Sequence, residues 1–246
     1  MFALADFPAV RPGEDLAGLI AAYGPQAGDV IVIAQKVVSK AEGRIVELES
    51  VTPSARAHEL AEQTGKDVRV VELVLRESTK VLRARPGLMI VEHRLGYIMA
   101  NAGIDASNVG AADQVILLPE DADRSARDLV ADIRANTGTE VGVVISDSWG
   151  RPWRLGTVGF AIGLAGIPAV VDMCGRPDLD GRPLQATVIG RGDELATAAS
   201  LLMGQADEGK PVVVIRGLDP SIGEGRAADL IRPVEDDLFR QGGDGK

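Results

Sequence analysis

The spacing of apolar residues along the chain predicts helices and strands that follow one another without a fixed repeat. In residues 14–23, apolar side chains recur at helical spacing, and Gly24 follows as a C-terminal cap. Residues 29–35 form a β-branched run, which is typical of a strand. Residues 39–44, SKAEGR, come next, and we expect them to form a turn that carries basic side chains.

Helical spacing gives way to strand spacing in the middle of the chain. Thr52 and Pro53 mark the start of a helix that ends at Gly65, and a second helix is expected over about residues 67–78. Within residues 81–118, short apolar runs (LMIVE, YIMA and QVILL) are separated by Gly, Asn and Pro. This pattern indicates consecutive strands.

The second half of the chain has the same mixed character. An amphipathic helix around residues 126–133 ends near Gly138 and leads into a strand over residues 140–146. The uncharged run 155–171 is interrupted by glycines and a proline, so we interpret it as buried core or site backbone and not as a membrane span. A helical run, ELATAASLLM, precedes the last strand, residues 213–217. Strands that succeed one another without helical crossovers favour an α+β fold with mixed or antiparallel sheets and flanking helices.

Composition places the chain among ordinary globular proteins. It has 246 residues, 46% of them hydrophobic, and its 36 acidic against 26 basic side chains give a net charge of −10. A chain of this length buries a large core without disulfides or a structural metal. The acidic balance argues against nucleic-acid binding, which depends on clustered Lys and Arg. Only 3% of the residues are aromatic, which argues against a base-stacking platform.

Cysteine and histidine are scarce. The single cysteine, Cys174, excludes an intrachain disulfide, and we expect it to be a small buried hydrophobe. His58 and His93 are too few for a zinc site and are expected to be structural. Residues 1–8, MFALADFP, lack the basic and apolar stretches of an export signal, so we expect a cytoplasmic protein.

Polar residues in NAGIDASNVG, residues 101–110, form the first candidate for chemistry. Asp105, Ser107 and Asn108 offer a carboxylate, a hydroxyl and an amide in a short loop. Such groups suit a hard divalent cation or a ribose. The alternative is that they hydrogen-bond their own backbone, as Asx residues in loops commonly do.

The second candidate is ISDSWGRPWR, residues 145–154. Asp147 and Ser148 are expected at a strand end, where they can hold Mg²⁺ or Mn²⁺, and Arg151 and Arg154 follow as clamps for phosphate or carboxylate oxygens. The alternative is a plain loop in which Arg151 pairs with Asp147 and both Trp side chains cover core edges.

Two further segments suit phosphate. Gly204 to Lys210 fits GxxxxGK, but Pro211 stands where a P-loop needs Ser or Thr, and the segment closes a helix instead of opening one. We therefore reject a P-loop and keep a glycine-rich connection beside a nucleotide as an open alternative. Ser39, Lys40 and Arg44 in SKAEGR offer phosphate contacts, but taken alone they describe an exposed turn.

SKAEGR, NAGIDASNVG, ISDSWGRPWR followed by AIGLAGIPA, and MGQADEGKPVVVIRG resemble, in order and spacing, the coenzyme F420-0 γ-glutamyl ligase family. The likeness extends over about residues 7–217. It implies a GTP-dependent amide ligase that adds L-glutamate to F420-0, with Mg²⁺ or Mn²⁺ and a monovalent cation such as K⁺. It also implies a family-specific α+β fold in an intertwined homodimer, with one ligase domain, of one or two subdomains, over residues 1–217. Residues 218–246 then form a polar, partly disordered extension.

The resemblance also implies roles for individual residues. Asp105, Asp147, Ser148 and Gln205 match metal ligands. Arg151 and Arg154 are candidates for holding an anionic substrate. The positions that match nucleotide contacts are Phe7, Pro8, Ala9, Val10, Ser39, Lys40, Arg44, Asn108, Met203, Gly204, Gln205, Ala206, Asp207, Glu208, Gly209 and Lys210.

One segment departs from the family pattern. Typical members carry a polar stretch after GRPWR, whereas this chain has Leu155, Gly156, Thr157, Val158 and Gly159. This departure motivates the alternative of a nucleotide- and metal-dependent glutamate ligase that acts on a different carboxylate. A second alternative is a GTP-binding homologue without ligase activity.

Overall fold

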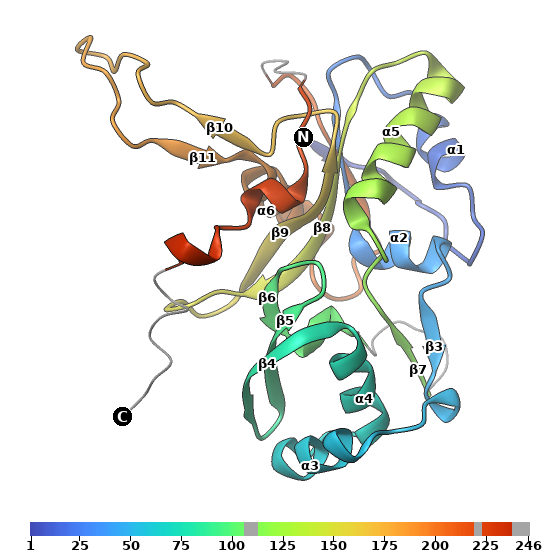
Figure 1. Ribbon diagram of the computed structural model, residues 1–246. Coiled ribbons are helices and arrows are strands. Elements are labelled where there is room, and N and C mark those ends of the chain that lie inside the picture. Colours follow the sequence, from blue (N-terminus) through green and yellow to red (C-terminus); the bar gives the residue numbers. More distant parts are fainter. Residues whose placement is uncertain (106–112, 219–222, 238–246) are drawn as a thin grey trace.

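The computed structural model describes residues 1–105, 113–218 and 223–237. Its centre is a five-stranded sheet in the order β1-β12-β2-β8-β9 (Figure 1). Strands β2 and β8 run parallel, and every other neighbouring pair in this sheet is antiparallel. The expected α+β fold with mixed sheets is therefore confirmed. The strands are β1 (Phe2–Ala3), β2 (Val30–Ala34), β8 (Gly142–Gly150), β9 (Thr157–Ala165) and β12 (Val212–Ile215).

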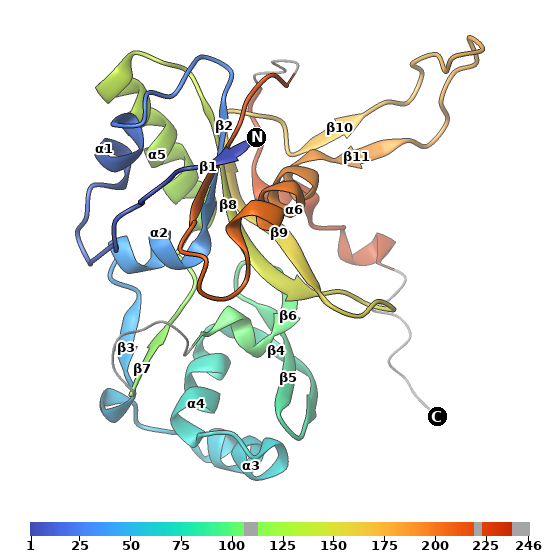
Figure 2. The same ribbon diagram turned by 180° about the vertical axis from the view of Figure 1, so that it is seen from behind.

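Alternating side chains of the central strands pack into two separate cores. Ile31 and Ile33 of β2 belong to a core with α1 (Leu16–Ala21) and α5 (Ala122–Thr137), while Val30 and Val32 pack with α6. Helix α6 (Arg191–Met203) therefore covers the opposite face of the sheet (Figure 2). This period of two is what a strand buried on both faces requires.

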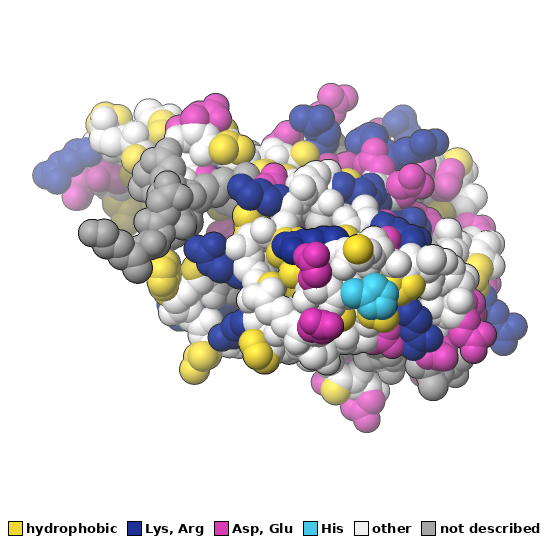
Figure 3. All heavy atoms as spheres, turned by 60° about the horizontal axis from the view of Figure 1, so that its bottom comes forward, with side chains coloured by type: hydrophobic (Ala, Val, Ile, Leu, Met, Phe, Trp, Pro, Cys, Tyr) yellow, Lys and Arg dark blue, Asp and Glu magenta, His cyan; other side chains and the backbone are white. Residues whose placement is uncertain are grey.

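A smaller subdomain has its own apolar core. It contains helices α3 (Ala55–Thr64) and α4 (Val68–Arg76) and the antiparallel strands β4 (Ser78–Arg85), β5 (Leu88–His93) and β6 (Ile98–Ala100). The 3₁₀ turn η2 (Asn101–Gly103) follows β6. Strands β3 (Ile45–Glu47) and β7 (Gln114–Ile116), with η1 (Leu48–Ser50), form a narrow ribbon that joins the subdomain to the sheet. On the face over α3 and α4, basic and acidic side chains are interspersed (Figure 3).

A long hairpin projects from the body of the molecule (Figures 1 and 2). It begins with β10 (Val170–Asp172) and returns through β11 (Val188–Gly190). Cys174 lies on this hairpin and is exposed, so the expectation that it is buried was wrong. The reason is that the hairpin extends away from both faces of the sheet.

Residues 223–237 contain η3 (Ala227–Leu230) and η4 (Val234–Asp236). The carboxylate of Asp123 accepts hydrogen bonds from the backbone N–H groups of Ala227, Ala228 and Leu164, and thereby attaches η3 to β9. The proposed boundary at residue 217 stays a prediction. Within the described ranges, no helix is long and apolar enough to cross a membrane.

Two expectations about local structure were wrong. Residues 35–41 form helix α2 (Gln35–Ala41), so half of SKAEGR is helical and not a turn. Strand β8 does not end at Asp147 but continues to Gly150, because β9 pairs with it as far as Thr157 opposite Gly150. The helix expected over about residues 67–78 is confirmed as α4, which ends at Arg76, and β4 begins at Ser78.

A charged cluster fastens the small subdomain to the sheet. Glu77 accepts hydrogen bonds from Arg44 at 3.1 Å and from Arg94 at 3.0 Å. Arg44 Nε also donates to the carbonyl of Leu118, and Arg94 to that of Glu120, and both carbonyls precede α5. Burial alone would raise the pKa of Glu77, but His93, Arg44 and Arg94 outweigh it and hold this pKa at about 2.

Replacing Glu77 by Gln should lower the free energy of unfolding at pH 7 by about 3 kcal/mol, because each pKa unit between 4.5 and 2 corresponds to about 1.4 kcal/mol. The folded-state pKa lies below the unfolded one, so this stabilisation is present above pH 4.5 and disappears as the pH falls toward 2. Denaturant titrations of both proteins between pH 7 and pH 2.5 measure it. If the free energies of unfolding of the two proteins changed equally with pH, this stabilisation could not come from the Glu77 carboxylate.

Candidate active site

A cavity of about 710 Å³ lies between the end of the parallel strands and the small subdomain. Segments far apart in the sequence form its walls. They are residues 7–10, 34–37 with Lys40, residues 99–100 and 103–105, residues 146–150 with Thr157 and Gly159, Ser200, residues 203–206, and residues 208–211. This location agrees with the rule that ligands bind at the carboxyl ends of parallel strands.

Helix α2 contributes Lys36 and Lys40 to the cavity. They lie one turn apart on the helix, which places both side chains on one face. Ser39 is on the other side, buried, and its hydroxyl accepts a hydrogen bond from Gln35 Nε2 at 3.2 Å. Arg44 is held by Glu77 and does not line the cavity. Of the basic segment, the structure therefore brings Lys40 to the cavity with Lys36, and places Ser39 and Arg44 behind it.

Asp105 also lines the cavity. Its backbone pairs with Ile116 of β7, which fixes the residue at the top of the ribbon. Its carboxylate Oδ2 is 2.7 Å from Nζ of Lys36, and each side chain is about one-third exposed. Asn108, a predicted nucleotide contact, lies outside the described residues, as does Ser107.

Asp147 and Ser148 line the cavity from β8. The register of the β8–β9 pair sets Asp147 opposite Phe160 and Ser148 opposite Gly159. Burial raises the pKa of Asp147 to about 7, and the negative charge of Asp105 adds to the increase. The backbone N–H of Ser148 and the charge of Lys36 oppose it. Asp105, Asp147 and Lys36 therefore lie close enough to share one electrostatic environment.

The loop between α6 and β12 supplies a third wall. All residues of the predicted segment 203–210 except Asp207 line the cavity. Gly204 has φ +73° and ψ −173°, a backbone conformation that is essentially restricted to glycine. The Glu208 carboxylate accepts a hydrogen bond from the backbone N–H of Ala206. Glycine is therefore required for the loop to close in this form.

Phe7, Pro8, Ala9 and Val10 complete the rim of the cavity. Arg151 and Arg154 do not line it, because they lie in the turn between β8 and β9, with Arg151 Nη1 donating to the carbonyl of Gly156. The unusual stretch after Arg154 reaches the cavity only through Thr157 and Gly159, and Leu155 is fully exposed.

The donors around this cavity suit a hard cation. Among the described residues, no three His, Cys, Asp or Glu side chains come together as a metal cluster. The candidate ligands are instead two carboxylates, Asp105 and Asp147, with the hydroxyl of Ser148 and the amide of Gln205. Oxygen donors of this kind are those that Mg²⁺ and Mn²⁺ prefer. The ammonium group of Lys36 on Asp105 shows that the position attracts positive charge.

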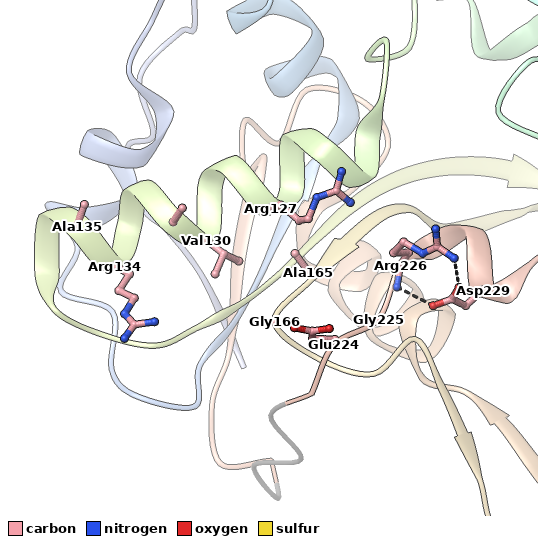
Figure 4. Close-up of a pocket in the computed structure, with 11 residues that line it drawn as sticks. Arg127, Val130, Arg134, Ala135, Ala165, Gly166, Glu224, Gly225, Arg226 and Asp229 are labelled. Atoms are coloured by element: carbon pink, nitrogen blue, oxygen red, sulfur yellow. Dashed lines mark hydrogen bonds and ion pairs between the residues drawn. The ribbon is translucent and has the colours of Figure 1, made fainter.

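A second hollow, of about 940 Å³, lies elsewhere on the molecule (Figure 4). Arg127 and Arg134 of α5 line it, together with Arg226, which pairs with Asp229. None of the predicted site residues belongs to it.

Comparison with known proteins identifies the family of the chain. The sequence profile described as F420-0:Gamma-glutamyl ligase matches residues 5–217. The chain belongs to this ligase family.

Relatives support the assignment over nearly the whole chain. A protein from Methanopyrus kandleri named coenzyme F420:L-glutamate ligase is 50% identical over 236 residues, which cover 94% of this chain and 93% of that protein. The protein of the same name from Archaeoglobus fulgidus is 45% identical, with 98% and 96% covered. The one from Methanocaldococcus jannaschii is 44% identical, with 96% and 94% covered.

Lys36 and Trp149 line the cavity of this F420-0:gamma-glutamyl ligase family member, but they are not among the site residues predicted from its sequence. Lys36 was overlooked, although its position directly after a buried strand and four residues before Lys40 was a usable signal. Trp149 was assigned to no ligand, yet it lines the cavity. Its ring stacks on Phe160 at 4.7 Å and lies 5.6 Å from Tyr97 of the small subdomain.

Replacing Asp147 by Asn should weaken Mn²⁺ binding by at least about tenfold, because even partners that only orient a metal ligand contribute that much. Calorimetric titration of the purified chain with MnCl₂ measures the affinity. Asp132→Asn, on the exposed face of α5, removes the same charge away from the cavity and should leave the affinity unchanged. Equal losses in both variants would contradict a metal site at Asp147.

Proposed function

We propose that this chain is a GTP-dependent ligase that joins L-glutamate to F420-0 with release of GDP and phosphate. The observation that carries the proposal is the convergence of Asp105, Asp147, Gln205 and the 203–210 loop on one cavity, in a member of this family. The names of the relatives support the choice of glutamate and F420 as substrates.

The chemistry requires an activated carboxylate. A carboxylate oxygen of F420-0 attacks the γ-phosphorus of GTP, the bond from that phosphorus to the β–γ bridging oxygen breaks, and GDP leaves. The product of this step is an acyl phosphate. The α-amine of glutamate then attacks the acyl carbon, its proton is lost, and the carbon–oxygen bond to phosphate breaks. One amide, one GDP and one phosphate result.

We assign a different role in this reaction to each group of residues in the cavity. Asp105, Asp147, Ser148 and Gln205 would hold Mg²⁺ or Mn²⁺, which when bound would neutralise the crowded charge of the phosphates. Lys40, Lys210 and the backbone of residues 203–206 and 208–210 line the cavity and would contact phosphate oxygens. Residues 7–10 would border the guanine. We also propose K⁺ as a monovalent cofactor, as the family resemblance implies.

Arg151 and Arg154 are proposed to hold an anionic substrate at the mouth of the site, since their turn follows directly on the cavity-lining strand. The neighbouring stretch from Leu155 to Gly159 keeps a second candidate open, in which the same machinery adds glutamate to a different carboxylate. We further propose that the enzyme is cytoplasmic, where GTP is available, and forms a homodimer through the projecting β10–β11 hairpin.

Purified chain with GTP, Mn²⁺, L-glutamate and F420-0 should release GDP only when both glutamate and acceptor are present. Mass spectrometry should show the acceptor heavier by one glutamate residue or more. The Asp147→Ala variant should be at least about a hundredfold slower, because a bound metal contributes several kcal/mol to such a reaction.

The other outcomes are equally informative. GDP release without the glutamylated product would favour another acceptor. GTP binding without any turnover would contradict the proposal and favour a non-catalytic nucleotide-binding protein.

A further inference from the structure

Lys36 has no role in the function proposed so far, yet it occupies a central position in the cavity. It lies in the first turn of α2, directly after β2, and its Nζ is 2.7 Å from Oδ2 of Asp105. Its charge also reaches Asp147 on β8, whose pKa it lowers against the dominant effect of burial. A single ammonium group is therefore paired with Asp105 and interacts electrostatically with Asp147, the two carboxylates that are candidate metal ligands.

A divalent cation bound through Oδ2 of Asp105 would compete with this ammonium group for the same oxygen. Mg²⁺ binds carboxylate oxygens at about 2.1 Å, and a lysine at hydrogen-bond distance from that oxygen would be repelled by it. Metal binding through Oδ2 therefore requires Lys36 to leave this oxygen. The flexible four-carbon stem of lysine permits such a movement, and the side chain is one-third exposed to the cavity it would turn into.

We propose that Lys36 neutralises the charge of Asp105 in the metal-free chain and is displaced from it when the divalent cation binds. The displaced ammonium group then contacts phosphate oxygens of the nucleotide. This inference rests on the proposed function, because it assumes that Asp105 and Asp147 hold the metal. It makes Lys36 a residue that couples the arrival of the metal to the binding of phosphate. Without it, the acidic pair would bind a divalent cation more tightly in the absence of nucleotide.

Helix α2 itself offers a matched control. Lys40 lies one turn further along and lines the same cavity. Lys40→Met therefore removes the same charge from the same helix face and reproduces any general electrostatic effect on metal affinity. Only Lys36→Met removes the ion pair with Asp105. Lys36→Arg keeps the charge and should preserve the competition.

The test is a titration of each purified protein with Mn²⁺ alone, followed by the electron paramagnetic resonance signal of the free ion. Lys36→Met should bind Mn²⁺ about fivefold more tightly than the unaltered chain, as expected when a competing, partly exposed ion pair worth about 1 kcal/mol is removed. Lys40→Met should change the affinity by less than about twofold, because charges screened by solvent interact weakly. Lys36→Arg should match the unaltered chain.

A second measurement tests the proposed contact of Lys36 with phosphate separately from its effect on Mn²⁺ binding. With Mn²⁺ saturating, Lys36→Met should raise the KM for GTP, and Lys36→Arg should restore it at least partly. Equal Mn²⁺ affinities in Lys36→Met and Lys40→Met, with Asp147→Asn still impaired, would overturn this inference and leave the proposed function intact. Absence of Mn²⁺ binding in every protein would overturn both.

Discussion

Strands β2 and β8 run parallel and in register from Val30 beside Gly142 to Ala34 beside Ser146, and there they part. After β2 the backbone enters α2, whereas β8 continues as a strand and pairs only with β9. The divergence opens a crevice at the carboxyl end of the pair and sets Lys36 and Asp147 next to it, although more than a hundred residues separate them in sequence. At the other end of the same strands, Arg216 fixes the buried carboxylate of Asp29 with two hydrogen bonds of 2.7 Å. The position of the site thus follows from one strand pairing.

The second wall of the crevice depends on a different interaction. The small subdomain packs around its own core, and its Tyr97 and Met99 are also buried in the core of the central sheet. Glu77 joins Arg44 and Arg94, and these arginines reach the carbonyls that lead into α5. Together, these apolar contacts and the charged cluster hold the β6–η2 segment and Asp105 near β8. Arg44 thereby influences the cavity without lining it, which gives a structural reason for a basic residue at that point of SKAEGR.

Local patterns predicted the long elements well. Helices α3 and α5 end at Gly65 and Gly138 with positive φ, as the cap residues indicated, and the β-branched runs became β2 and β12. Helix α2 was missed because its N-cap, Ala34, makes no side-chain cap hydrogen bond, and because Val37 and Val38 are typical of strands. The extension of β8 through Asp147 and Ser148 was missed because only the pairing with β9 makes those polar residues a strand. Motif spacing identified the 203–210 loop and both carboxylates, but the ion pair of Lys36 with Asp105 arises from tertiary contacts that no local pattern contains.

In the proposed mechanism, the crevice between β8 and the small subdomain is one site for a divalent cation and a nucleotide. Crystals of the chain grown with Mn²⁺ and GDP, measured at the manganese absorption edge, would locate both ligands. We expect an anomalous peak inside the cavity, bonded to carboxylate oxygens of Asp105 and Asp147, with the ammonium group of Lys36 moved from Asp105 toward the phosphates. A manganese ion bound by neither carboxylate, with nucleotide phosphates outside the cavity, would contradict it.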